Sequence, residues 1–215
     1  MRSSFGRSRL VRQLATAAPL AADAGGMDVA ERTSLWIGAF DAIRLQGVHR
    51  AVRATDAQQR MPLPAARARA ERLADNLQRV RGALAAAIAR EVEVDGTYGP
   101  WRQRHADLQR HMEQMVGNLR EQVRDALAGV SPRMRQLAAL DAAMQEVTAP
   151  REQALLPTAL DLLQRNYEQR VAQDDEADAA FASGWREALR AEVDLRLEPV
   201  EGLVEALRKE SDQEQ

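Results

Sequence analysis

Two stretches of the chain repeat apolar residues at alternating steps of four and three, which places them on one face of a helix. The first stretch contains Leu73, Leu77, Val80, Leu84 and Ala87. The second contains Trp101, His105, Leu108, Met112, Met115 and Leu119. A helix with such a face must bury it against another element, and two long faces of this kind predict that helix packs on helix.

The segment DGTYGP, residues 95–100, separates the two stretches and combines helix stop and start signals. Gly96 suits the position just past a helix, and Pro100 suits the first turn of the next one. We therefore expect a helix from Ala65 to about Val94, a reversal of the chain, and a long antiparallel hairpin whose apolar faces meet.

Further helices are predicted after this hairpin. Ser131 followed by Pro132 predicts a helix start, because serine caps the free N–H groups of the first turn and proline fits the first helical position. Thr148 and Pro150 repeat this combination of a capping residue and a proline and predict a second helix start. Pro157 predicts a kink in that second helix. The residues expected to point inward from these two helices are Met134, Leu137, Leu140, Met144, Val147, Leu155, Leu156, Leu160, Leu163, Tyr167 and Val171.

Apolar residues recur at steps of four through residues 181–197, which predicts a helix that ends at Pro199. A last short helix is predicted over residues 200–207. The alternation in VDLRL, residues 193–197, would also suit a strand paired with residues 92–94. Neighbours rich in Ala, Glu and Leu favour the helix. The fold class is therefore predicted as all-α, a helical bundle built around the hairpin with additional C-terminal helices.

Composition agrees with an all-α fold and excludes several chemistries. The 215 residues are 45% hydrophobic but only 4% aromatic, which favours close helix packing over a sheet. The absence of cysteine excludes disulfides, thiolate nucleophiles and cysteine metal sites. The formal net charge of −2 gives no overall attraction to nucleic acid or an anionic membrane. No run reaches the roughly 20 apolar residues that span a bilayer.

Three regions are predicted along the chain: a basic segment and linker at 1–27, the bundle at 28–208 and a charged tail at 209–215. The first region is basic and contains serine, as targeting segments do. Arg12 and Gln13 interrupt its apolar run, so we expect no secretion signal.

The segment WRQRHADLQRHMEQM, residues 101–115, holds two of the three histidines and is the first place to look for a reactive centre. His105 falls on the apolar face, so we expect a buried neutral imidazole, with its pKa lowered by desolvation and a carboxylate of the facing helix as a candidate hydrogen-bond partner. His111 lies about 120° further around the helix, so one metal ion cannot bridge both rings. Both histidines are interpreted as packing or surface residues, and Met112 and Met115 as core filling.

Other motifs give no support to an enzyme. The Walker A, HExxH and GxSxG patterns are absent, and so is a GxGxxG after a strand. The acidic clusters DDEAD and KESDQE lack the turn glycine and ligand spacing of a calcium loop. We predict no catalytic, cofactor-binding or metal-binding residue.

The strongest local basic character lies in four arginines of the first dozen residues: Arg2, Arg7, Arg9 and Arg12. They are candidate contacts for nucleic acid phosphates or a protein partner. The alternative is a basic terminus whose Leu and Val side chains dock on the bundle. The segment RARAERLADNLQRVR, residues 67–81, is also rich in arginine, but Glu71 and Asp75 are interspersed, as on a solvated helix face.

Five segments in order resemble a family of uncharacterised proteobacterial proteins over almost the whole chain: SRLVRQLA, LWIGAFDAIRL, LAALDAAM, REQALLPTALDLLQRNYEQ and EVDLRLEPVEGLVEALR. The resemblance implies neighbouring genes for a MotA-like membrane protein and an OmpA/MotB-like peptidoglycan-binding protein, an arrangement similar to the third type of Zorya anti-phage defence. It implies a cytosolic accessory of an ion-driven envelope motor. No catalytic residue is carried over from the family.

Two classes of function follow from these observations. The first is a non-enzymatic helical adaptor that binds proteins, with the cytoplasmic tail of the MotA-like subunit and a companion cytosolic accessory as candidate partners. It would be cytoplasmic and recruited to the inner membrane by the motor. The alternative is a nucleic-acid-binding sensor or effector that uses the N-terminal arginines. A hydrolase that depends on His105 is a third and weaker hypothesis.

Overall fold

The computed structural model describes residues 46–47, 61–171 and 177–212, and nearly all of these residues are helical. The long helices within these ranges are α4 (Leu63–Ala89), α5 (Gly99–Ala128), α6 (Pro132–Val171) and α7 (Ala177–Asp212). No strand occurs in these ranges. Residues 193–197 belong to α7, and residues 92–94 lie in the link between α4 and α5. The prediction of an all-α bundle is confirmed.

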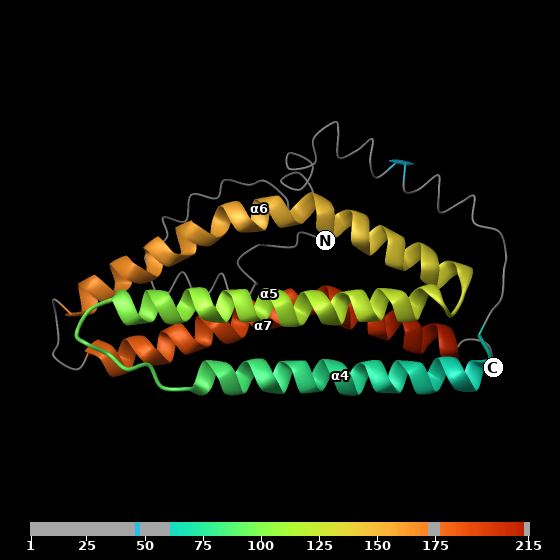
Figure 1. Cartoon of the computed structure of the whole chain (residues 1–215), viewed down its shortest axis with the longest axis horizontal. Helices are drawn as coiled ribbons and strands as arrows, with labels where there is room; N and C mark the ends of the chain where they lie inside the picture. Colours follow the sequence, from blue (N-terminus) through green and yellow to red (C-terminus); the bar gives the residue numbers. More distant parts are fainter. Residues whose placement is uncertain (1–45, 48–60, 172–176, 213–215) are drawn as a thin grey trace, which may run out of the picture.

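The helices run along the length of the molecule, with α6 arched over α5 (Figure 1). α4 and α5 run antiparallel, and both contact α7 (Figure 1). α4 packs more extensively on α7 than on α5. The apolar faces of α4 and α5 therefore enter a core shared with α7, and the hairpin is one part of the bundle instead of a unit closed on itself.

The predicted apolar faces form this core. On α4, Leu73, Leu77 and Leu84 are buried, and Val80 and Ala87 pack at the edge. On α5, Met115 packs at the edge and the other predicted residues are buried. Every predicted inward residue of α7 is buried: Phe181, Trp185, Leu189, Val193, Leu197, Val200, Leu203, Val204 and Leu207. Each fully buried leucine or valine contributes roughly 1.5–3 kcal/mol relative to an exposed one.

The prediction of two separate helices after Ser131 is wrong, because α6 is continuous through Pro150 and Pro157. A proline inside a helix removes one backbone hydrogen bond and bends the axis without necessarily ending the helix. Figure 1 shows α6 bowed, with its two arms descending toward the ends of α5. Tertiary contacts at both arms therefore outweigh the stop signal at its middle.

The prediction of which α6 residues point inward is also wrong in part. Leu140 and Met144 are 36% and 37% exposed, although the sequence predicted both inside. The polar residues Asp141 and Gln145 face α5 instead and bond to arginines there. These polar contacts rotate the predicted apolar stripe partly into solvent. Val171, at the end of α6, is also exposed rather than buried.

α7 passes through Pro199 without a break, which corrects the prediction of a separate last helix. The proline cannot donate to the carbonyl group of Leu195, four residues earlier. Leu195 is 44% exposed, so this part of α7 lies at the surface. The helix runs on to Asp212 and includes the first residues of the charged tail.

The predicted start of α6 at Ser131 and Pro132 is confirmed, whereas Gly96 was wrongly predicted as the residue just past α4 and lies in the link, seven residues beyond Ala89. Ser131 Oγ accepts a hydrogen bond from the Met134 backbone N–H at 3.2 Å and caps α6, with Pro132 as the first helical residue. Gly96 adopts φ +78°, a left-handed conformation that favours glycine. α4 ends at Ala89 rather than at Val94.

Candidate functional site

The four N-terminal arginines predicted as contacts, Arg2, Arg7, Arg9 and Arg12, lie outside the described residues. So does the division between the predicted linker and bundle at residues 27 and 28. Both statements remain predictions. The candidate site is therefore sought among the helices α4 to α7.

His105 is buried between α5 and α7, with 3% of its surface exposed. Trp185 Nε1 donates to His105 Nδ1 at 3.2 Å, so the neutral ring carries its proton on Nε2. The hydrogen-bond partner is thus an indole and not the expected carboxylate. Burial lowers the pKa of His105, Glu192 opposes this shift, and Arg196 adds to it. The predicted burial of His105 is confirmed, and the direction of its pKa shift favours the neutral ring.

An aromatic cluster surrounds this histidine at the end of the bundle where α5 and α7 begin. Trp101 packs edge-on against Phe181 and Trp185, with ring centroids 5.3 and 5.1 Å apart. Tyr98 donates its hydroxyl to the Leu160 carbonyl at 3.3 Å, and burial raises its pKa to about 12. Phe181 also packs edge-on against Tyr98 and Tyr167, so these rings contact one another as in a packed core.

His111 is exposed on the outside of α5. Asp107, four residues before it, pairs with Arg110 and accepts a hydrogen bond from Gln103 at 3.1 Å. Among the described residues, no group of three or more histidine, aspartate and glutamate side chains could hold a metal ion. The segment 101–115 is therefore one side of a packed helix.

A second polar cluster joins α5 to α6. Arg120 donates Nε and Nη2 to the two carboxylate oxygens of Asp141, at 2.8 and 2.6 Å. Arg124 Nε lies 3.1 Å from Asp141 Oδ2, and another Arg124 nitrogen bonds to Gln145. The Asp141 side chain is only 10% exposed. This bidentate contact fixes α6 against α5 and leaves no oxygen of Asp141 open to a ligand.

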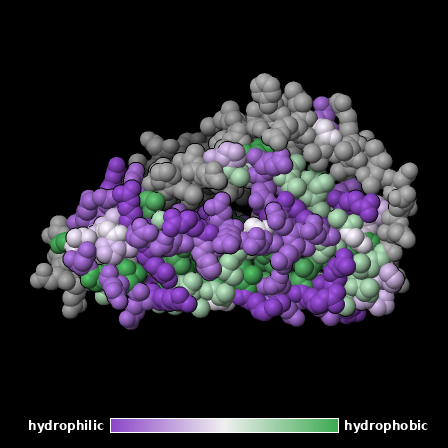
Figure 2. All heavy atoms as spheres, viewed as in Figure 1, coloured by the Kyte–Doolittle hydropathy of each residue, from purple (hydrophilic) through white to green (hydrophobic). Residues whose placement is uncertain are grey.

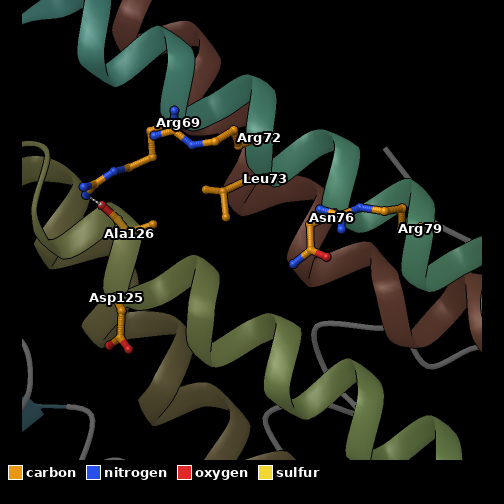
Figure 3. Close-up of a pocket in the computed structure, with 7 residues that line it drawn as sticks. All are labelled: Arg69, Arg72, Leu73, Asn76, Arg79, Asp125 and Ala126. Atoms are coloured by element: carbon orange, nitrogen blue, oxygen red, sulfur yellow. Dashed lines mark hydrogen bonds between the residues drawn. The ribbon is translucent and has the colours of Figure 1, made fainter.

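The candidate functional site is an open groove of about 490 Å³ between α4 and α5 (Figure 3). Its lining residues are Arg69, Arg72, Leu73, Asn76, Arg79, Asp125 and Ala126. Leu73 points between the two helices in Figure 3, so the floor is apolar and the α4 edge is basic. Asn76 donates to Gln122 at 2.9 Å and ties the two helices together beside it.

Arg69 has a structural role in this groove. Its Nη1 donates to the Ala126 carbonyl at 3.0 Å, one of the last carbonyls of α5. Arg135 bonds the neighbouring Ala128 carbonyl at 3.2 Å. Gly129 leaves the space that Arg69 needs, because an added Cβ would lie 3.0 Å from its Nη1. The two arginines therefore cap the C-terminus of α5.

Arg72 and Arg79 are both exposed on the same edge of α4, about 10.5 Å apart along the helix. The ion pairs of the described part of α4 involve Arg67 with Glu71, and Arg81 with Asp194 and Glu201. Arg72 and Arg79 thus present their charges to solvent. They can bind a carboxylate or phosphate without breaking an existing pair.

A groove of opposite charge, about 580 Å³, lies between α4 and α7. Its acidic lining residues are Asp75, Glu198, Glu201 and Glu205. Arg208 is the single basic residue among those that line it. α4 therefore has a basic groove along one side and an acidic groove along the other. Figure 2 shows hydrophilic residues over most of the visible face of the molecule, with hydrophobic residues limited to short patches.

The fold and these two grooves define an all-α bundle protein with a charged, grooved exterior. The chain belongs to the family described as Protein of unknown function (DUF3348), whose model matches residues 1–209. No curated protein and no solved structure matches the chain. None of the helices α4 to α7 combines the length and hydrophobicity needed to cross a bilayer.

Sequence reasoning interpreted residues 67–81 as a solvated face and missed the groove. Arg67, Arg72 and Arg79 are exposed, as that interpretation required, whereas Arg69 and Arg81 are half-buried. The opposite wall of the groove comes from α5. Arg69 and Ala126 are 57 residues apart in the chain. No local signal in either segment indicates this pairing.

Proposed function

We propose that this chain is a non-enzymatic helical adaptor that binds partner proteins through its charged exterior. The observation that carries the proposal is the arrangement of two grooves of opposite charge on the two sides of α4, outside a filled core. The apolar faces of α4, α5 and α7 are used in internal packing, whereas Leu140 and Met144 of α6 are exposed. Binding therefore depends on exterior residues such as Arg72 and Arg79.

The biological setting of the proposal is a Zorya-like anti-phage defence system. It rests on the order of the five motifs described above, and membership of the DUF3348 family is compatible with it. In this setting the chain is a cytoplasmic accessory that a MotA-like motor subunit recruits to the inner membrane. Its partners are the cytoplasmic tail of that subunit and a companion cytosolic accessory.

Affinity purification tests the proposal directly. The tagged full chain is expressed together with its neighbouring genes, and the proteins retained at low and high salt are identified. We expect the MotA-like subunit or the companion accessory to be retained at low salt and to dissociate as the salt concentration rises. Recovery of the chain without either protein, together with phage resistance unchanged by deletion of its gene, would reject the adaptor role.

A second candidate function is nucleic acid binding, and the exposed Arg72 and Arg79, which pair with no described carboxylate, favour it alongside the N-terminal arginines. Each phosphate contact lowers the logarithm of the affinity for duplex DNA by about 0.9 per tenfold rise in salt. Fluorescence anisotropy with labelled DNA measures this slope. A variant with Arg7, Arg9 and Arg12 changed to alanine is expected to have a weaker slope. Absence of affinity in the parent protein rejects this function.

A further inference from the structure

We infer that the outer face of α4 associates with a second copy of the same chain. In this arrangement the α4 helices of two copies run parallel about a two-fold axis. Arg72 and Arg79 of each copy then face Glu205 and Glu198 of the other. The inference does not rest on the proposed adaptor role, but it uses the same two grooves, so a second copy and a partner protein would compete for this face.

The first support is a matched spacing of opposite charges. Arg72 and Arg79 are seven residues apart on the basic edge of α4, and Glu198 and Glu205 are seven residues apart on the acidic edge of α7. Seven helical residues span about 10.5 Å, so both pairs have the same separation along the bundle. Two such pairs form two ion pairs at once when the helices are nearly parallel.

The second support is the level of these charges along the molecule. Arg81 lies 3.9 Å from Asp194 and also pairs with Glu201. It is therefore at the same position along the bundle as the middle of residues 194–201, near Glu198. α4 and α7 are antiparallel. Ala74, seven residues before Arg81, is therefore level with Glu205, seven residues after Glu198. Ala74 and Glu205 do line the same groove.

It follows that Arg79 and Arg72 lie only two residues, about 3 Å, from the levels of Glu198 and Glu205. An arginine side chain can span this offset.

The third support comes from symmetry. A two-fold axis parallel to α4 exchanges the two sides of the helix and preserves every level along it. The basic groove of each copy then meets the acidic groove of the other, and two ion pairs form on each side. A two-fold axis that is perpendicular to α4 and lies in the plane of this face would instead bring the basic grooves of the two copies together. The charge pattern thus selects the parallel arrangement.

The centre of this face can accommodate a second helix. Asp75, Gly82 and Ala86 are exposed on the side of α4 away from the core. A Cβ added at Gly82 would meet no atom within 4 Å, and the small residues allow close approach of two backbones. In the acidic groove, Arg208 opposes the attraction, while Glu201 is already paired with Arg81 and Glu205 lies 3.4 Å from Lys209. Asp75 and Glu198 keep the groove acidic overall, but Asp75 lies beside its own copy across the axis, and this pair of carboxylates opposes association.

Sedimentation velocity of the full chain over a range of concentrations tests the inference. We expect a dimer that weakens as salt is raised. The double substitution Arg72→Glu and Arg79→Glu should raise the dimer Kd about 100-fold, because four attractive contacts become repulsive. Glu198→Arg with Glu205→Arg should do the same. Combining all four changes should restore association to within about tenfold, which a general loss of folding could not do.

A matched control reverses two exposed arginines outside both grooves, Arg165→Glu and Arg190→Glu, and should leave the Kd unchanged. The absence of cysteine allows a second measurement. Gly82→Cys and Asp75→Cys, introduced separately, should each form a disulfide-linked dimer, because parallel α4 helices place both positions beside their own copies. An antiparallel pair could link at only one of them.

A full chain that is monomeric at every concentration would overturn the inference. So would a control variant that weakens association as much as the groove variants, or a cross-link at only one position.

Discussion

Acidification from about pH 8 to about pH 5 is expected to destabilise the fold through His105. Protonation of Nδ1 would convert the acceptor for Trp185 Nε1 into a donor and break that 3.2 Å hydrogen bond. It would also place a charge on a ring with only 3% of its surface exposed. For both reasons the folded state favours the neutral imidazole, and burial lowers the pKa of His105 below its ordinary value of 6.5.

The sign and the limit of the effect follow from proton linkage. Between the folded pKa and the unfolded pKa of about 6.5, the unfolded chain binds more protons than the folded one. The contribution of His105 to stability is therefore complete above about pH 6.5 and falls as the pH decreases through this window. One proton sets the steepest slope, about 1.4 kcal/mol per pH unit. Glu192, near the ring, reduces the effect and Arg196 increases it.

Urea unfolding of the wild type and of His105→Gln at a series of pH values measures this slope. Glutamine cannot titrate, and its carbonyl oxygen can still accept a hydrogen bond from Trp185. The difference in unfolding free energy between the two proteins should change with pH below about 6.5 and stay constant above it. The exposed His111→Gln serves as the control and should follow the wild type. Parallel curves for wild type and His105→Gln would refute the assignment of His105 as a buried neutral residue.

Three further stability predictions use the same unfolding assay. Asp141→Ala should lower the free energy of unfolding by about 3–5 kcal/mol, because it leaves Arg120 and Arg124 without their carboxylate. Arg81→Ala removes a more exposed ion pair and should lower it by less than about 1 kcal/mol. Equal losses would contradict this ranking. Ser131→Ala removes the cap of α6 and its bond to Glu210, and should cost about 1 kcal/mol; an unchanged midpoint would argue against the cap. Gly96→Ala should cost about 1–2 kcal/mol because of the positive φ, and a gain in stability would show that the turn is not left-handed.

Periodicity and local capping chemistry were enough to predict much of this fold. The spacing of Leu73 to Leu84 and of Trp101 to Leu119 identified two core faces, and Ser131 with Pro132 identified a helix start. These features depend on nearby residues, and local sequence therefore encodes them. The exceptions are Pro150 and Pro199, which remain inside helices because packing on both sides outweighs the loss of one hydrogen bond.

The features that sequence reasoning missed depend on contacts between distant segments. Leu140 and Met144 were expected inside, but Asp141 bonds to arginines of α5 and turns the polar side of α6 inward. The arginine groove needs both α4 and α5, and the indole partner of His105 comes from α7, 80 residues away. Such pairings depend on how the bundle closes and not on any one segment.

Phage protection by cells that carry the complete gene set tests most directly whether this protein acts through its exterior. Arg72→Glu with Arg79→Glu changes only exposed charge, whereas His105→Gln changes only a buried ring; circular dichroism would verify that both variants are folded. We predict that the surface variant loses protection and the buried variant keeps it. Loss of protection in a folded His105→Gln protein, with full protection in the surface variant, would place the function inside the bundle and contradict our proposal.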